Sequence, residues 1–340
     1  AGAALLPVLA TSTWSQGRPT AATPPAIVKP PRLSLGDTIG VIAPASGLVP
    51  ADFDQALRNL EALGFKTRVG PHARGNRGHH SGTDAERLHD LHWAFRDPEV
   101  RAIWCVRGGD GAPRLLPNVD FGLIAANPKI LVGYSNITAL HLAIQQRTGL
   151  VTFHGPVGAS EFTDYTRTHV LNVLTKPAAP YVIPPSADNA AQPSELFRLE
   201  TIRGGRARGP LVGGCLSLVT ALAGTPWALG DLTGKVLFLE DVDEQPYRID
   251  RMLTQLRQSV DLRALAGVAL GVFNGCTPTE KKPSAPLRDI LRDHFGALGV
   301  PVIYGLSFGH IRDQFTLPMG ITAELDTSAA PLTLLETSVV

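Results

Sequence analysis

The sequence predicts an α/β protein with a Rossmann-like, parallel-sheet N-terminal domain and a smaller mixed α+β C-terminal domain. Three observations support this fold class. At 340 residues the chain is longer than one ordinary domain. Its first half alternates short apolar runs with amphipathic helical patterns, as in a parallel sheet covered on both faces. Prolines gather between residues 166 and 200, where the periodic signal weakens, and this segment is the predicted crossover between the domains.

Residues 1–31 have the composition of a tail followed by a proline-rich linker. The apolar decapeptide 1–10 is too short to span a bilayer, so we expect no stable membrane insertion. Its texture resembles the hydrophobic part of a secretory signal, which favours a periplasmic or otherwise exported protein; a cytoplasmic protein with a loose tail is the alternative. Neither part has amphipathic spacing, so we expect no docking of this segment on the folded core.

The N-terminal domain is expected over residues 32–165. Its predicted strands span 38–44, 101–106 and 130–132, and its predicted helices span 51–63, 84–95 and about 135–147. The helix over 84–95 has a capping residue, Thr83 or Asp84, and ends before Pro98. A glycine cluster, residues 107–111, follows the second of these strands and could bring backbone N–H groups close to a ligand oxygen.

The C-terminal domain is expected over residues 201–330. Strands are predicted at 236–240, 268–273 and 302–304, with one strong helix from 249 to about 260. The pattern does not determine how these strands connect.

Composition and motifs argue against several classes of function. A net charge of +1 without a basic stripe gives no support to nucleic-acid binding. Three widely spaced cysteines form no CxxC pair, and we expect buried free thiols. The histidine pairs 79–80 and 89/92 lack acids at ligand spacing, HExxH is absent, and the glycine cluster is neither a dinucleotide fingerprint nor a P-loop. We therefore expect no metal and no cofactor.

Ser135 is the strongest candidate for a reactive side chain. It follows the apolar run 129–132 and begins a helical pattern, so its hydroxyl is expected at the carboxyl edge of the sheet, in the manner of a nucleophile elbow. The full Gly-x-Ser-x-Gly pattern is absent because Ile137 fills the last position. The alternative is that Ser135 merely caps the helix. Cys215 is a weaker nucleophile candidate, since it enters an apolar run with no cation nearby.

Glu240 and His310 also follow apolar strands, which suggests a carboxylate and an imidazole near the same cleft. The acidic run that begins at Glu240 would ordinarily be a solvated loop, but Glu240 directly continues its strand and could be partly buried. His154 also ends a strand and is the rival to His310 as the base.

With these residues in place, the chain resembles the LD-carboxypeptidase family of serine peptidases, which includes muramoyl-tetrapeptide carboxypeptidases and microcin C self-immunity hydrolases. The matching segments, in family order between residues 31 and 325, are Gly36–Ser46, Gly82–Arg87, Arg107–Gly109, Gly133–Ser135, Gly213–Leu216, Glu240–Val242 with Pro246–Arg251, and Gly305–His310. The resemblance implies a Ser135–Glu240–His310 triad in a cleft between the domains, and a homodimer.

The resemblance also implies roles for the glycine cluster and the residue after Ser135. Gly109 and Asn136 would supply oxyanion N–H groups, and Arg107, Gly108 and Asp110 would contact substrate. Two positions depart from the family pattern: Asn136 stands where aspartate is usual, and Asp110 where tyrosine is common.

The activity implied is hydrolysis of the L,D-amide bond to a terminal D-amino acid in peptidoglycan-derived tetrapeptides. A microcin C-type acyl-sulfamoyl nucleotide hydrolase with the same triad, and a non-catalytic muropeptide-binding protein, are the alternatives.

Overall fold

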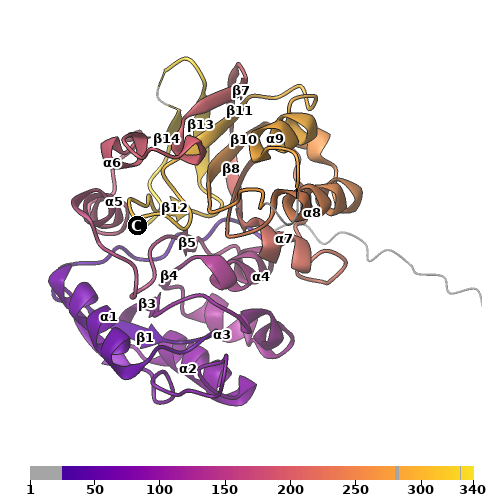
Figure 1. Ribbon diagram of the computed structural model, residues 1–340. Coiled ribbons are helices and arrows are strands. Elements are labelled where there is room, and N and C mark those ends of the chain that lie inside the picture. Colours follow the sequence, from indigo (N-terminus) through magenta and orange to yellow (C-terminus); the bar gives the residue numbers. More distant parts are fainter. Residues whose placement is uncertain (1–24, 280–282, 330) are drawn as a thin grey trace, which may run out of the picture.

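The computed structural model describes residues 25–279, 283–329 and 331–340. The chain forms two halves, each built on its own β-sheet, and Figure 1 shows them stacked, with the earlier, indigo-to-magenta strands in the lower half. The α/β class and the two-domain arrangement predicted from the sequence are confirmed.

The first sheet has six strands in the order β12-β5-β4-β3-β1-β2, and β1 to β5 run parallel. Its strands are β1 (Thr38–Ile42), β2 (Lys66–Val69), β3 (Val100–Cys105), β4 (Ile130–Gly133), β5 (Phe153–His154) and β12 (Leu317–Pro318). The accompanying helices are α1 (Pro50–Ala62), α2 (Asp84–Arg96), α3 (Phe121–Ala126) and α4 (Thr138–Thr148). The strand order reverses between β1 and β3, and parallel sheets bind ligands beside such a reversal, outside the carboxyl ends of the strands.

The second sheet is the larger one, with eight strands in the order β6-β14-β13-β8-β9-β10-β11-β7. Its strands are β6 (Tyr181–Ile183), β7 (Glu200–Arg203), β8 (Arg206–Cys215), β9 (Val236–Val242), β10 (Gly267–Asn274), β11 (Val302–Leu306), β13 (Thr322–Asp326) and β14 (Leu332–Leu334). Its helices are α7 (Leu216–Ala221), α8 (Pro246–Ser259) and α9 (Leu287–Phe295). The second sheet therefore has more strands than the first, because short edge strands without a clear sequence pattern extend it.

The chain crosses between the halves more than once. The predicted crossover contains most of α5 (Asp164–Leu174), which starts two residues before it, and all of β6 and α6 (Ala187–Ala190). Near its end the chain returns, and β12 pairs antiparallel with β5, where Leu317 lies opposite His154. Figure 1 shows β12 beside β5 where the two halves meet. This return ties the two sheets together at the strand that carries His154.

The predicted tail behaves differently from expectation in its described part. Val28 N–H donates to the Gly149 carbonyl and Val151 N–H donates to the Val28 carbonyl, both at 2.9 Å. Lys29 Nζ lies 2.7 Å from a carboxylate oxygen of Glu336. The expectation of no docking is therefore wrong for residues 25–31, because backbone hydrogen bonds rather than an amphipathic face attach them. Residues 1–24 lie outside the described part of the chain.

Packing explains the regular elements. The strands β1, β3, β4 and β9 are almost wholly buried, as apolar strands covered by helices on both faces should be. Thr83 starts α2 with a capping box, because its side chain accepts from Glu86 N–H while the Glu86 carboxylate accepts from Thr83 N–H. No helix among the described residues is long and apolar enough to cross a membrane.

Candidate active site

Ser135 sits on a strained turn between β4 and α4. Its φ is +62°, in the left-handed region that non-glycine residues seldom occupy. It opens a short 3₁₀ turn (Ser135–Ile137), and neither that turn nor α4 has a side-chain cap. The capping alternative is therefore not what the structure contains. Strain of this kind concentrates at functional sites, where the surrounding fold enforces it.

The glycine loop after β3 lies directly against Ser135. A Cβ atom on Gly108 would lie 2.9 Å from Ser135 Oγ and 3.2 Å from Asn136 N, so a side chain there would crowd the hydroxyl. Gly109 has a φ of +98°, and a Cβ there would lie 2.3 Å from Ser46 Oγ. Only glycines allow this backbone to come so close.

Ser46, on the loop after β1, holds the glycine loop in place. Its N–H donates to the Gly108 carbonyl at 3.2 Å, and its Oγ accepts from Asp110 N–H at 3.0 Å. The same hydroxyl donates to the His79 carbonyl at 2.6 Å. Sequence reasoning gave Ser46 no role, although it lies in one of the matching segments, because a contact across 64 residues leaves no local pattern.

Asn136 has a structural task that explains its identity. Its side chain is buried, and Oδ1 accepts from Ala112 N–H at 2.7 Å, which joins the turn to the segment after the glycine loop. An aspartate carboxylate could accept the same N–H, so asparagine at this position preserves the local geometry. As the second residue of the 3₁₀ turn, Asn136 keeps its own N–H available near Ser135.

Glu240 and His310 form a close pair in the second half. Glu240 lies on β9 and is fully buried, and its Oε2 is 2.7 Å from Nδ1 of His310. The imidazole packs edge-on against Tyr134, the residue before Ser135, with ring centroids 4.7 Å apart. Asn274 Nδ2 donates to the His310 carbonyl at 2.9 Å and anchors the loop from β10. The packing of His310 on Tyr134 brings the predicted base beside the turn that carries Ser135.

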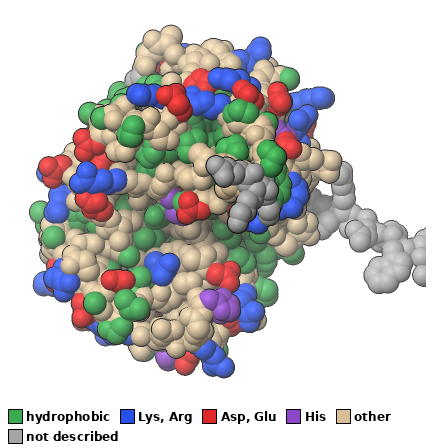
Figure 2. Space-filling model, in the orientation of Figure 1, with side chains coloured by type: hydrophobic (Ala, Val, Ile, Leu, Met, Phe, Trp, Pro, Cys, Tyr) green, Lys and Arg blue, Asp and Glu red, His purple; other side chains and the backbone are tan. Residues whose placement is uncertain are grey.

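The charges of this pair support each other. Burial alone would raise the pKa of Glu240, but the charge of His310 and its hydrogen bond hold that pKa below the usual value. Burial alone would lower the pKa of His310, yet the Glu240 carboxylate raises it. Asp241, next along β9, shows the opposite effect for a carboxyl: burial and the neighbouring Glu240 raise its pKa to about 6. Glu240 and Asp241 are both buried, and the space-filling view shows only a histidine beside an acidic side chain near the middle of this face, between the two halves (Figure 2).

His154 is not the partner of the carboxylate in the same sense. Its Nε2 lies 3.9 Å from Oε1 of Glu240, beyond hydrogen-bond range, and the ring is fully enclosed. Burial lowers the pKa of His154 to about 4. The geometry therefore favours His310 over His154 as the base, because His310 is hydrogen-bonded to Glu240 whereas His154 is enclosed and is not.

The three cysteines are free and buried, as expected. Burial, with the nearby Glu240 and Asp241, raises the pKa of Cys215 well above its usual value. A buried thiol of this kind is a poor nucleophile. Cys215 N–H instead donates to Thr138 Oγ1 at 3.1 Å, which links β8 to the start of α4.

Arg107 and Asp110 flank the two glycines of the loop. Arg107 is exposed; it donates to the Gly47 carbonyl at 3.3 Å and forms no ion pair with any residue in the described part of the chain. Asp110 is also exposed, with Oδ2 3.4 Å from Nε2 of His80 and 3.6 Å from Nε2 of His79. The loop that lies against Ser135 through Gly108 therefore also carries an exposed guanidinium without an acidic partner among the described residues.

Two His/Asp groups in the described residues are compact enough to hold an ion. In one, Asp90 already accepts from His72 N–H at 2.9 Å and lies 2.8 Å from His72 Nδ1, which is a hydrogen-bonded structural contact. In the other, His79, His80 and Asp110, burial and the Arg87 cation lower the pKa of His80. An ion there would face that guanidinium.

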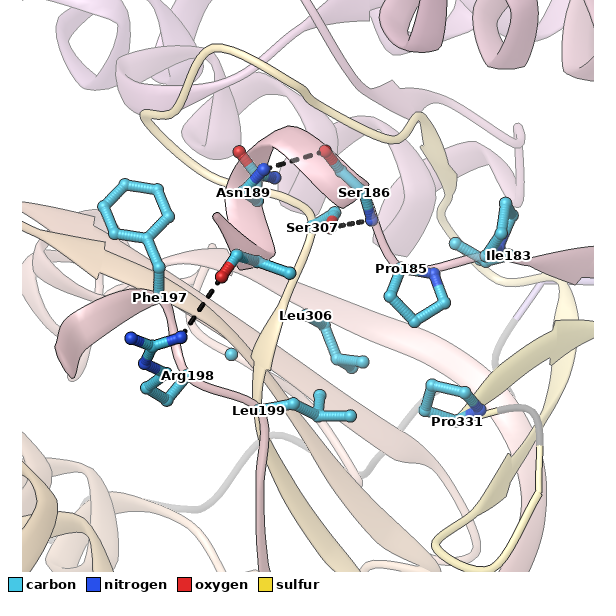
Figure 3. A pocket seen from close by; sticks show the side chains of 13 residues that line it. Ile183, Pro185, Ser186, Asn189, Phe197, Arg198, Leu199, Leu306, Ser307 and Pro331 are labelled. Atoms are coloured by element: carbon cyan, nitrogen blue, oxygen red, sulfur yellow. Dashed lines mark hydrogen bonds between the residues drawn. The ribbon is translucent and has the colours of Figure 1, made fainter. Parts of the chain in front are cut away.

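A small hollow of about 110 Å³ lies between the crossover and β11 (Figure 3). On its wall, Ser186 N–H donates to Ser307 Oγ at 3.0 Å, and Ser186 Oγ donates to Asp313 Oδ2 at 2.5 Å. Asn189 Nδ2 donates to the Asp313 carbonyl at 2.9 Å. The crossover thus fixes both ends of the loop that carries His310.

Comparison with known proteins matches this arrangement to one family. Residues 39–155 match a model of the LD-carboxypeptidase N-terminal domain, and residues 208–325 match the LD-carboxypeptidase C-terminal domain. The chain is 41% identical over 305 residues to a probable murein peptide carboxypeptidase of Bacillus subtilis, covering 88% of this chain and 92% of that protein. It is 35% identical to the murein tetrapeptide carboxypeptidase of Pseudomonas aeruginosa, covering 85% and 92%. Among solved structures, an MccF-like protein from Bacillus anthracis superposes with a TM-score of 0.78 at 31% identity, covering 90% and 99%.

Proposed function

The chain belongs to the LD-carboxypeptidase family of serine peptidases, and on that premise we propose that it releases a terminal D-amino acid from peptidoglycan-derived tetrapeptides by cleaving the L,D-amide bond. The observation that carries the proposal is the Glu240–His310 pair, 2.7 Å apart, whose imidazole packs on the residue before the strained Ser135. That neighbourhood contains each group that acyl transfer through serine requires.

In the proposed reaction, Glu240 accepts from Nδ1–H of His310 and leaves Nε2 free to act as a base. As Ser135 Oγ forms a bond to the substrate carbonyl carbon, Nε2 takes the hydroxyl proton. The same nitrogen then gives that proton to the leaving amine as the C–N bond breaks, which releases the D-amino acid. Water repeats these steps to free the acyl product. Ser135 Oγ makes no hydrogen bond among the described residues. In the proposed reaction its hydrogen bond to Nε2 of His310 therefore forms when the substrate is bound.

The negative oxygen of the tetrahedral intermediate needs fixed donors. We assign them to the N–H groups of Gly109, which follows the glycine packed against Ser135, and of Asn136, the next residue in the 3₁₀ turn. Ser46 and the buried Asn136 side chain hold these two backbones rigidly. Donors that are already oriented stabilise the oxyanion without reorganisation.

The free carboxylate of the substrate needs a cation, and we assign it to Arg107. A guanidinium without an acidic partner in the described part of the chain is available for a two-pronged contact with a carboxylate. Gly108 and Asp110 line the same loop and would contact the substrate. Asp110, with an exposed carboxylate, favours a positively charged group on the acyl side.

No cofactor takes part in this reaction, since a serine triad needs neither metal nor nucleotide. The alternative substrate class is an acyl-sulfamoyl nucleotide, which the similarity to a microcin C7 self-immunity protein MccF solved in complex with aspartyl sulfamoyl adenosine supports. The third possibility is a muropeptide-binding protein without turnover.

One experiment separates these possibilities. The purified protein is incubated with a muramoyl tetrapeptide ending in D-alanine, with the same peptide ending in L-alanine, and with an aminoacyl-sulfamoyl nucleotide, and the products are followed by mass spectrometry. We expect the wild-type protein to release D-alanine and to leave the other two compounds intact. The variants Ser135→Ala, Glu240→Ala and His310→Ala should remain folded, and each should have a kcat at least about 10³-fold lower. Turnover of the nucleotide alone would support the alternative class. Binding without turnover would leave only the binding protein, and full activity in all three variants would exclude the triad.

A further inference from the structure

His154 places a second, enclosed imidazole behind the Glu240–His310 pair. The ring is 2% exposed, and neither of its nitrogens has a hydrogen-bond partner among the described residues. Oε1 of Glu240, the oxygen that His310 does not use, is buried and unpartnered in the same way. These two orphaned groups face each other, with Nε2 of His154 3.9 Å from Oε1.

The other walls around His154 are aromatic. The rings of Tyr134, Phe238 and Phe308 lie edge-on to it, with centroid distances of 6.0, 5.3 and 6.4 Å. The Glu240 carboxylate offers a buried, unpartnered acceptor 3.9 Å from Nε2. A carboxylate oxygen and an imidazole N–H that are buried without partners destabilise the fold, because each has given up its hydrogen bonds to water.

We propose, on the basis of the function proposed above, that His154 is a positioning residue which donates from Nε2–H to Oε1 of Glu240. The carboxylate would then be held at both oxygens, by His310 on one side and by His154 on the other. A displacement of about 1 Å reduces the 3.9 Å separation to ordinary hydrogen-bond length.

The role of such a contact follows from charge. A donor on Oε1 fixes the rotation of the Glu240 carboxylate and disperses its charge, which makes it a weaker proton acceptor. Without that donor the carboxylate stabilises the His310 imidazolium more strongly, which raises the pKa of His310. The ring is then neutral, and able to act as a base, only at higher pH. Burial lowers the pKa of His154 to about 4, so His154 stays neutral at working pH and carries one N–H. The titratable groups that act on this pair and on His154 include Tyr134 and His141 from the first half and Cys215, Asp241 and Asp243 from the second.

The first test uses the unmodified enzyme and does not depend on activity. Histidine is labelled with ¹⁵N, the His154 signal is assigned by its loss in His154→Gln, and its two ring nitrogens are followed from pH 5 to 9. We expect a neutral ring with the proton on Nε2 throughout. A proton on Nδ1 instead, or an imidazolium in this range, overturns the proposal even if the enzyme is fully active. A protein that turns over none of the offered substrates would contradict the proposed function and leave this result readable.

The second test compares His154→Leu with His154→Gln, whose amide can place an N–H near the position of Nε2. In the leucine variant we expect kcat to fall about tenfold or more, and the acidic limb of kcat/KM to move up by about half a pH unit. Glutamine should restore both. Thr152→Val, which replaces a buried hydroxyl without a partner two residues away, is the matched control and should match the wild type. Equal losses in the leucine and glutamine variants, with an unmoved limb, would mean that His154 only fills space.

Discussion

Replacing Gly214 by alanine should separate the two halves of the active site without touching any reacting group. Gly214 lies on β8 with a φ of +142°, and a Cβ there would lie 2.5 Å from Cγ2 and 2.6 Å from Oγ1 of Thr138. Thr138 begins α4, three residues after Ser135, while β8 pairs with β9 so that Cys215 lies opposite Glu240. The new methyl group therefore pushes apart the start of α4, which follows the Ser135 turn, and the strands β8 and β9, the second of which carries Glu240.

The size of the effect can be worked out from these distances. Carbon atoms pack at about 3.5–4.0 Å, so a contact of 2.5 Å demands a separation of about 1 Å. Overpacking of this order costs about 1–3 kcal/mol, backbone strain adds about 1–3 kcal/mol, and loss of the Cys215–Thr138 hydrogen bond about 1 kcal/mol. We expect the free energy of unfolding to fall by about 3–7 kcal/mol. A misplacement of about 1 Å between nucleophile and base should lower kcat by about 10²-fold.

Chemical denaturation and release of D-alanine measure the two effects separately. Gly224→Ala is the matched control, because Gly224 has a φ of +83° but open space around its Cβ, so it reports backbone strain alone. Thr138→Ala in the Gly214→Ala background removes the clashing atoms and should restore most of kcat while the strain remains. If Gly214→Ala keeps its kcat, or if Thr138→Ala fails to restore it, the idea that this contact sets the spacing of the halves is refuted.

Four further predictions follow from the site and its surroundings. Because Glu240 raises the pKa of His310 and the base must be neutral, kcat/KM should rise with pH along a limb centred above 6.5; a centre below 6.5 contradicts this. Burial lowers the pKa of His141 to about 3 and of His154 to about 4, below the unfolded value of 6.5, so the unfolded chain binds more protons. The unfolding free energy should therefore drop below pH 6.5 by up to about 1.4 kcal/mol per pH unit for each histidine, and His141→Phe should flatten the curve measured in urea. Removing residues 1–24 should move Tm by no more than about two degrees. Removing residues 1–31 should lower the free energy of unfolding by about 2 kcal/mol, since it breaks the Val28 and Lys29 contacts. Equal Tm values for the two truncated proteins would contradict this. Activity should survive EDTA unchanged, and restoration by zinc after its loss would show that a metal is needed after all.

The buried strands, and the placement of Ser135 and Glu240 on or beside them, could be predicted because each leaves a local pattern. Ser135 and Glu240 follow apolar runs, and such runs become buried strands whose carboxyl ends meet at one edge. The short edge strands could not be predicted in this way. Leu317 and Pro318 form a two-residue strand that pairs with β5, and two residues are too few to show a period. Docking of Val28 was missed for a related reason, since it depends on backbone hydrogen bonds and not on a side-chain pattern.

The choice between His154 and His310 shows where sequence reasoning reaches its limit. Both follow strands, and both end near Glu240, so local pattern cannot separate them. The two differ in their surroundings in the folded chain. His310 lies on a loop after β11 and packs against Tyr134, the residue before Ser135, whereas His154 lies on β5, which pairs with β12. The two imidazoles approach different oxygens of one buried carboxylate, so they need not be alternatives for the same role. In the mechanism that we propose, His310 exchanges protons and His154 keeps the Glu240 carboxylate in position.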